Sequence, residues 1–150
     1  MKASEVRALV VSTIEGLTPA GGKLSTRDGF REVPAANPSQ GSRSFVVEVQ
    51  EYPHPVGPST RGMQRNSSSG EQMAVTFAIG TIYELKESGR ALDDAEGIVY
   101  ALRTLPGVNN KIYTVDPITP LPDRTVLTSG DNSTVRLAAY NVRIMYDGRP

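Results

Sequence analysis

The side chains that could do chemistry in this sequence are few, and they are not grouped as catalysis requires. The single histidine, His54, stands between Pro53 and Pro55, where the sequence offers no partner that would orient a general base. The serine run 67–69 has neither a Gly-x-Ser-x-Gly frame nor a histidine matched to it. We therefore predict no catalytic residue, and an enzyme whose site cannot be read from residue spacing remains the alternative.

Carboxylates come close together at two places in the chain. Asp93, Asp94 and Glu96 lie where we expect the first turn of a helix, and the helix dipole stabilises negative charge there. Glu48 and Glu51 belong to a strand segment, and we expect Glu48 to face solvent or a neighbour. A two-carboxylate nuclease or glycosidase is an alternative that nothing in this spacing favours.

The sequence has few residues of the kinds and spacings that bind metal ions or phosphates. The chain has no cysteine, which excludes disulfides, thiolate metal sites and a cysteine nucleophile, and a single histidine excludes multi-histidine metal cages. Gly21-Gly22-Lys23 has the wrong spacing for a Walker phosphate loop. We expect no cofactor and no bound metal.

Length and charge narrow the class of protein. The 150 residues suit a single domain over 1–150, with enough hydrophobic residues (38%) for a core, while 14 glycines and 11 prolines indicate long loops. Because 16 basic residues balance 16 acidic ones, general nucleic-acid binding and anionic-membrane binding are disfavoured. No apolar run approaches the roughly 20 residues of a membrane span, and the first residues do not resemble a signal peptide. We expect no membrane partner and no sequence-specific nucleic acid, and a protein that acts where it is made.

Two helices are predicted from apolar residues that recur at steps of three and four. The first contains Val6, Val10 and Ile14 in its stripe, with Ser4 as the N-cap and a stop at Gly16. The second covers roughly residues 91–104. Its apolar stripe is formed by Leu92, Ala95, Val99, Leu102 and Leu105, and Ile98 and Ala101 lie beside the stripe.

The start of the second helix has two interpretations. Ser88 could cap a longer helix, whereas Asp93 followed by Glu96 resembles a capping box and would begin a shorter one. Leu105-Pro106-Gly107 ends either version, because proline cannot continue the helical hydrogen-bond ladder.

Strands are predicted wherever hydrophobicity alternates. They cover residues 45–52, 72–85 and 134–146, with smaller strands at 111–115 and 125–128, the last after a proline-broken stretch at 116–122. The alternation slips at Gly80, which indicates a β-bulge or a close backbone approach, and near Ala139, which indicates a twist or bulge. The order α-β-β-α-β-β predicts an α+β fold with a mainly antiparallel sheet, two helices on one face, and a long hairpin arm between the first two strands.

Two long segments, residues 18–43 and 53–71, have turn residues but no hydrophobic period, and connections of this length are usually functional. They have net charges of +2 and +1, while residues 44–52 and 72–105 each have −2. Basic loops on an acidic body favour head-to-tail contact between copies, which forms rings or filaments; the alternative is that these charges are merely solvated. The predicted contact positions are Arg27, Arg31, Arg61, Met63 and Arg65.

The size of the chain and the order of its elements resemble the tail terminator (tail completion) proteins of long-tailed bacteriophages. A short opening helix and the strand Ser44-Phe45-Val46-Val47-Glu48-Val49 are followed by a hairpin arm, a second strand, a helix such as 93–104 and the closing strand 138–146. The resemblance covers nearly the whole chain and rests on no diagnostic motif.

This resemblance implies a non-enzymatic virion protein of the tail or neck, made in the host cytoplasm. Such proteins form a ring, hexameric in this family, that ends the tail tube and joins it to the head–tail connector. The implied partners are further copies of the chain, the tail tube protein and the head–tail connector protein. The long loops exceed those of a minimal member, which leaves open which loop faces which partner. Another phage neck or tail component, or a monomeric binding module that uses the arm at 53–71 as a flap, remain alternatives.

Overall fold

The computed structural model describes residues 1–17, 25–26, 44–56, 72–84, 88–116, 119–127 and 134–149. The elements follow each other as α1 (Ala3–Glu15), β1 (Ser25–Thr26), β2 (Ser44–Pro55), β3 (Gln72–Glu84), α3 (Ser88–Arg103), α4 (Leu105–Val108), β4 (Ile112–Val115), β5 (Thr119–Leu127) and β6 (Thr134–Asp147). The predicted α+β class and the order α-β-β-α-β-β are confirmed.

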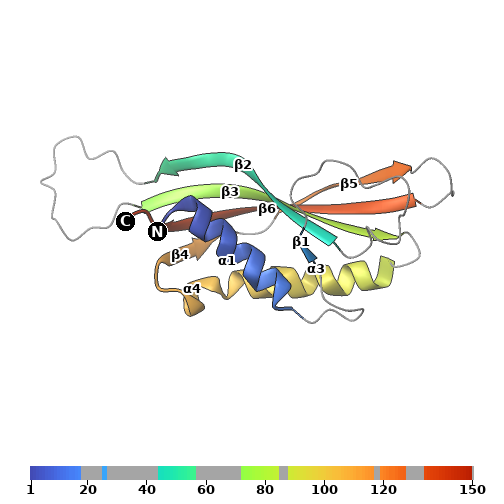
Figure 1. Cartoon of the computed structure of the whole chain (residues 1–150), viewed down its shortest axis with the longest axis horizontal. Coiled ribbons are helices and arrows are strands. Elements are labelled where there is room, and N and C mark those ends of the chain that lie inside the picture. Colours follow the sequence, from blue (N-terminus) through green and yellow to red (C-terminus); the bar gives the residue numbers. More distant parts are fainter. Residues whose placement is uncertain are drawn as a thin grey trace, which may run out of the picture.

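The sheet has the strand order β1-β2-β3-β6-β4, and β5 pairs with β6 as well. The short β1 is parallel to β2, whereas β2, β3 and β6 pair antiparallel, as do β4 and β5 with β6. Figure 1 shows α1, α3 and α4 on one side of this sheet, as the sequence predicted for its two helices. Val56 donates its N–H to the carbonyl of Gln72 at 2.8 Å, which closes the paired part of the β2–β3 hairpin.

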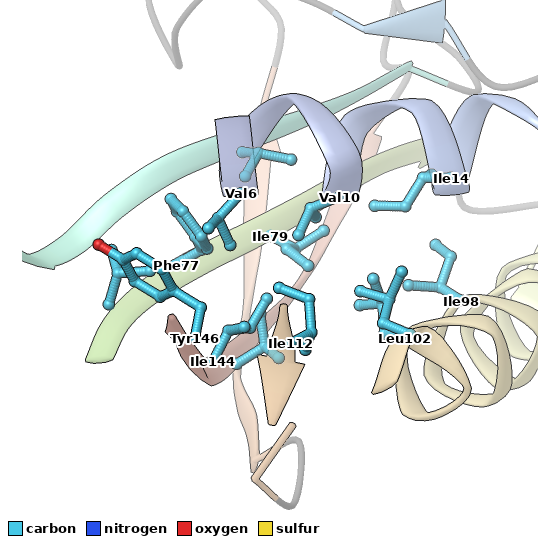
Figure 2. Close-up of a cluster of buried hydrophobic side chains, with 14 of the residues drawn as sticks. Val6, Val10, Ile14, Phe77, Ile79, Ile98, Leu102, Ile112, Ile144 and Tyr146 are labelled. Carbon is cyan, nitrogen blue, oxygen red and sulfur yellow. The ribbon is translucent and has the colours of Figure 1, made fainter. Parts of the chain in front are cut away.

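The hydrophobic core lies between the helices and the sheet. In α1, Val6, Val10 and Ile14 are all fully buried, because a spacing of four residues places them on one stripe of the helix. They meet Phe77 and Ile79 of β3 and, from the side of α3, the buried Ile98 and Leu102 (Figure 2). The alternation in the sequence places Met73, Val75, Phe77 and Ile79 on one face of their strand, and these residues all lie in or against the core. It also places Phe45, Val47 and Val49 on one face; the first two are buried, whereas Val49 is 47% exposed.

The central strands β3 and β6 stay in register from the pair Gln72–Asp147 to the pair Glu84–Val135. The predicted bulge at Gly80 is therefore wrong, since this residue pairs with Val46 and Ala139 without a shift. Alternation continues through Thr81, which is only 2% exposed and occupies the position that an apolar residue was expected to fill. Because threonine is buried at this position, the strand needs no slip in phase.

The register shifts lie in strands nearer the edges. In β2 they fall between Val49 and Glu51 and between Glu51 and His54. The irregularity predicted near Ala139 is found in the facing strand β5, between Leu121 and Arg124, and not in the β3–β6 register. Bulges are common at sheet edges, where an extra residue does not disturb a second partner strand.

Several predicted boundaries are wrong. β2 continues through Pro53 to Pro55, which belong to the paired hairpin and not to the loop that was placed at 53–71. β5 begins at Thr119, so it includes four residues of the stretch expected to be broken by proline, among them Pro120 and Pro122. A strand with one partner tolerates proline, because the missing N–H can face away from the ladder. The rest of the arm, 57–71, lies outside the described residues.

The helix ends also differ from the sequence interpretation. Ser4 lies inside α1, and the Glu5 carboxylate accepts the Lys2 backbone N–H at 2.7 Å. Because α3 begins at Ser88, the carboxylates of Asp93 and Glu96 stand beyond its first turn, and the capping-box interpretation is wrong. A short helix, α4, was not predicted after Thr104.

Candidate assembly surfaces

The loop positions that the sequence suggested as contacts do not fall within the described part of the chain. Arg27 and Arg31 lie between β1 and β2, and Arg61, Met63 and Arg65 lie in the arm between β2 and β3. Their role remains a prediction from the sequence. The surfaces discussed below are built from other residues.

The residues considered for catalysis do not converge in the described structure. His54 is exposed, and its Nδ1 lies 3.1 Å from the carbonyl oxygen of Tyr52, two residues away in the same strand. Asp94 is 6% exposed inside α3, while its neighbours Asp93 and Glu96 point to solvent.

Over the described ranges, no group of three or more His, Asp or Glu residues is arranged to hold a metal ion. Nor is any helix in these ranges long and apolar enough to cross a membrane.

Large hydrophobic side chains that reach solvent are gathered in two segments of the described structure. On β2, Val49 is 47% and Tyr52 is 84% exposed. On the segment from α3 to β4, Tyr100 is 74%, Val108 is 76% and Tyr113 is 36% exposed. We call the first group, with Glu48 and Glu51, the strand surface. The second group, with Arg103 and Lys111, is the helix surface.

The two surfaces lie on opposite flanks of the molecule. In the sheet, β2 and β4 are on opposite sides of the central pair of β3 and β6. α4 packs beside β4 and is joined to α3, whereas α1 packs beside β2. Figure 1 accordingly shows β2 along one border of the molecule, with α3 and α4 along the other.

Among the described residues, β2 lies at the edge of the sheet for most of its length. The part of β1 that is described pairs with Ser44 and Phe45. The Nε of Arg7 in α1 then donates to the carbonyl of Val47 at 3.0 Å, which satisfies one exposed edge acceptor. Beyond that point Val49 points to the same face as Val47 but is half-exposed, and the register shifts that follow turn Tyr52 out to solvent.

The helix surface contains a shallow hollow along α3. It has a volume of about 320 Å³ and is lined by Ala95, Glu96, Val99, Tyr100 and Arg103. Ala95 and Val99 were predicted in the core stripe, but they are only half-buried, because the fully buried stripe follows Ile98 and Leu102. A hollow formed by one helix, near the lower end of the ~300–1,000 Å³ of ligand sites, suits a single side chain better than a ligand.

The two surfaces also contain charged side chains. β2 contains the carboxylates of Glu48 and Glu51 and no lysine or arginine. Residues 97–113 contain Arg103 and Lys111, both exposed, and no aspartate or glutamate. Glu96 precedes this basic segment and lies at the hollow. Each flank therefore has charges of both signs, because Arg7 of α1 lies beside β2 and Glu96 lies beside Arg103 on α3.

The sheet face opposite the helices has a different character. Ala74 and Ala78 of β3 are buried there beside polar contacts: Thr76 Oγ1 donates to Glu51 Oε2 at 2.6 Å, and Arg143 pairs with Asp116 at 3.2 Å. The side-chain oxygen of Asn141 is buried without a hydrogen-bond partner among the described residues. Small and polar side chains thus form this face, and Glu51 of the strand surface reaches it through Thr76.

Sequence reasoning missed the exposed tyrosines as site residues. A signal was present, since Tyr100 lies off the apolar stripe of its helix and Tyr52 lies on the polar side of its strand, next to a proline. Large aromatic residues on faces that should meet water are typical of interaction surfaces.

Comparison with known proteins identifies no family for this chain. No protein-family model matches the sequence, and no curated protein matches it. A function must therefore be argued from the residues and from the arrangement of the two surfaces.

Proposed function

We propose that this protein is a non-enzymatic structural protein of a bacteriophage virion, which forms a ring that ends the tail tube and joins it to the head–tail connector. The observation on which the proposal rests is the pair of exposed apolar surfaces on opposite flanks of one fold. The order of elements, which resembles that of the tail terminator proteins, supplies the biological setting.

Two different surfaces on opposite flanks favour a ring over a dimer. When a surface binds the same surface of a second copy, assembly through that surface stops at a twofold dimer. A contact between two different surfaces leaves one of each free, so it can be repeated from copy to copy. Such a series closes into a ring if the rotation between copies divides a full turn. The family resemblance implies a hexamer.

The contacts with the tube and the connector are assigned to other parts of the chain. The loop residues Arg27, Arg31, Arg61, Met63 and Arg65 are the proposed positions. Loops poor in core residues suit docking to several partners, because the cost of ordering them can be met by the interfaces that they form.

A monomeric binding module is the other class of function to be tested. The hollow on α3 is about 320 Å³ and is formed by one helix, which gives a small ligand few surfaces to contact. A different neck or tail component would share the assembly surfaces, and it would differ in which end of which partner it binds.

The test is binding to tail tubes assembled from the tube protein of the same virus. We expect electron microscopy to show rings at one end of each tube and tube growth to stop when the protein is added. The double variant Arg61→Glu/Arg65→Glu should lose capping while keeping the circular dichroism spectrum. A protein that stays monomeric and leaves tubes uncapped at high concentration would overturn the proposal.

A further inference from the structure

We infer that α3 of one copy packs antiparallel against α3 of a second copy, in a twofold dimer that forms before the ring assembles. The inference rests on the proposed function for its place in assembly, and it names the state of the free protein. The occupant of the hollow on α3 is the same helix of the second copy.

The outer face of α3 is apolar at its centre, although it meets solvent along one border of the molecule (Figure 1). The buried side of the helix follows Asp94, Ile98 and Leu102, which are at most 6% exposed. Because successive residues of a helix are turned by about 100°, Val99 and Tyr100 project from the opposite side. Tyr100 is 74% exposed there. A large aromatic residue on such a face is typical of a contact surface.

The two charged residues at the hollow are placed to pair between antiparallel helices. Glu96 and Arg103 are both exposed and line the hollow, one before and one after the pair Val99 and Tyr100. Neither side chain has an ion pair or a hydrogen bond among the described residues. When two copies of α3 run in opposite directions about an axis midway between Val99 and Tyr100, Glu96 of each copy faces Arg103 of the other.

The same charges select the antiparallel pair over a parallel one. Parallel helices would bring Glu96 against Glu96 and Arg103 against Arg103, and like charges at an interface disfavour that pairing. In the antiparallel pair, the Tyr100 ring of each copy enters the hollow beside Ala95 and Val99 of the other. The hollow has a volume of about 320 Å³ and lies along one helix, so it suits one aromatic side chain. Aromatic residues enclosed by a charged rim are typical of the centre of an interface.

The dimer is weak and reversible, because the contact is made by one helix from each copy. The outer face of the 16-residue α3 offers less than the roughly 800 Å² per partner of a standard interface. The dimer covers Tyr100 and Arg103, so a paired copy cannot offer the helix surface to a neighbour in a ring. We therefore expect the dimer to separate on the tail tube, where contacts of the loops add to those of the ring.

Sedimentation equilibrium of the full-length protein tests the two charge pairs. Glu96→Arg and Arg103→Glu should each raise the dissociation constant of the dimer about tenfold, because each substitution acts twice in a twofold pair. The double variant Glu96→Arg/Arg103→Glu should restore the dimer, since both pairs form again with the signs exchanged. Lys111→Glu, which makes the same change of charge outside α3, is the matched control and should leave the dimer unchanged. Circular dichroism checks that each variant is folded.

Disulfide trapping tests the direction of the helices, since the chain contains no cysteine and each introduced thiol is the only one. The Glu96→Cys and Arg103→Cys proteins are mixed under a mild oxidant, and the dimers are counted on non-reducing gels. We expect the mixed dimer to exceed either self-dimer several-fold, because only the mixed pair brings the two thiols together and keeps one charge pair. Self-dimers in excess of the mixed dimer would show a parallel pair and overturn the inference.

The outcomes separate this inference from the proposed function. If the unmodified protein shows no dimer, or the double variant fails to restore it, while the unmodified protein still caps tail tubes, the antiparallel dimer is wrong and the proposed function stands. If the charge exchange and the trapping behave as expected but tubes stay uncapped, the contact is real and the assignment to the tail is wrong.

Discussion

The two faces of the central strands β3 and β6 differ in the size and polarity of their side chains. Alternate residues of the same chain segments form them. On the face toward the helices, Phe77 and Ile79 of β3 and Val142 of β6 are at most 1% exposed. On the other face, Ala78 lies opposite Asn141, and Thr76 opposite Arg143. Large apolar residues are covered by the helices, whereas the small residues of the other face are buried among polar side chains. The face without helices is therefore not an apolar surface waiting for a partner, and the exposed apolar side chains are found at the flanks.

Two adjacent residues of β6 show the same contrast in their acidity. Tyr146 points into the core, where burial raises the pKa of its phenol. Asp147 points the other way, and hydrogen bonds from the Arg149 side chain and backbone lower the pKa of its carboxyl to about 2. Its carboxylate lies 2.6 Å from the Arg149 guanidinium. Burial of the phenol and hydrogen bonds to the carboxylate thus shift the pKa values of two neighbouring groups by different causes.

The largest effect is expected from a cavity on the helix-covered face. Phe77→Ala should lower the free energy of unfolding by about 3–5 kcal/mol, because the side chain is 1% exposed and the cavity cannot refill with water. Urea unfolding followed by circular dichroism measures the change. A loss below about 1 kcal/mol would mean that the core around Phe77 relaxes freely, and the contrast between the faces would fail.

A smaller effect is expected directly opposite, on the polar face. Thr76→Ala removes the hydrogen bond to Glu51, and we expect a loss of about 1 kcal/mol, since the exposed Glu51 carboxylate can bind water in its place. Thr76→Ser, which keeps the hydroxyl, is the matched control for the same unfolding measurement. A loss as large as that of Phe77→Ala would show that this face is also packed as a core.

The third effect appears only in acid. Because the pKa of Asp147 is about 2 in the folded protein and near its ordinary value of 3.8 in the unfolded chain, the unfolded state takes up the proton first as the pH falls. Its contribution to stability is complete above about pH 4 and is lost toward about pH 2. Asp147→Asn should be less stable at neutral pH and should show a flatter dependence across that interval. Parallel pH profiles of the two proteins would contradict the role of the Arg149 contact.

Much of the fold could be predicted from the sequence, because burial of a stripe or of alternate residues leaves a periodic pattern. Val6, Val10 and Ile14 indicated the buried side of α1, and the alternation through Val75, Phe77 and Ile79 indicated the buried face of β3. The predictions were wrong where the neighbouring strands, and not the local sequence, decide whether a segment forms a strand. Pro53 and Pro120 were taken as breaks, yet they lie in strands with an open side, where a missing N–H is tolerated.

The candidate surfaces were less accessible to sequence reasoning. The sequence placed Ala95 and Val99 on the apolar stripe of their helix and Ile98 beside it, whereas the rotation of α3 against the sheet buries Ile98 and leaves the other two beside a hollow. Tyr52 and Tyr100 are far apart in the sequence, and their positions on opposite flanks depend on the order of the strands. The loops that the sequence favoured as contacts keep that role as a prediction.

The sequence by itself determined the element order, the buried sides of the first helix and of the long strands, and the absence of cysteine chemistry, since each depends on residue type and short spacing. The tertiary structure decided which strand lies at an edge, which side of α3 is only half-buried, and that the exposed apolar residues of β2 and of the segment from α3 to β4 lie on opposite flanks. Those features depend on the pairing of strands that are far apart in the sequence and on the rotation of a helix against the sheet. Neither can be predicted from local hydrophobic periodicity.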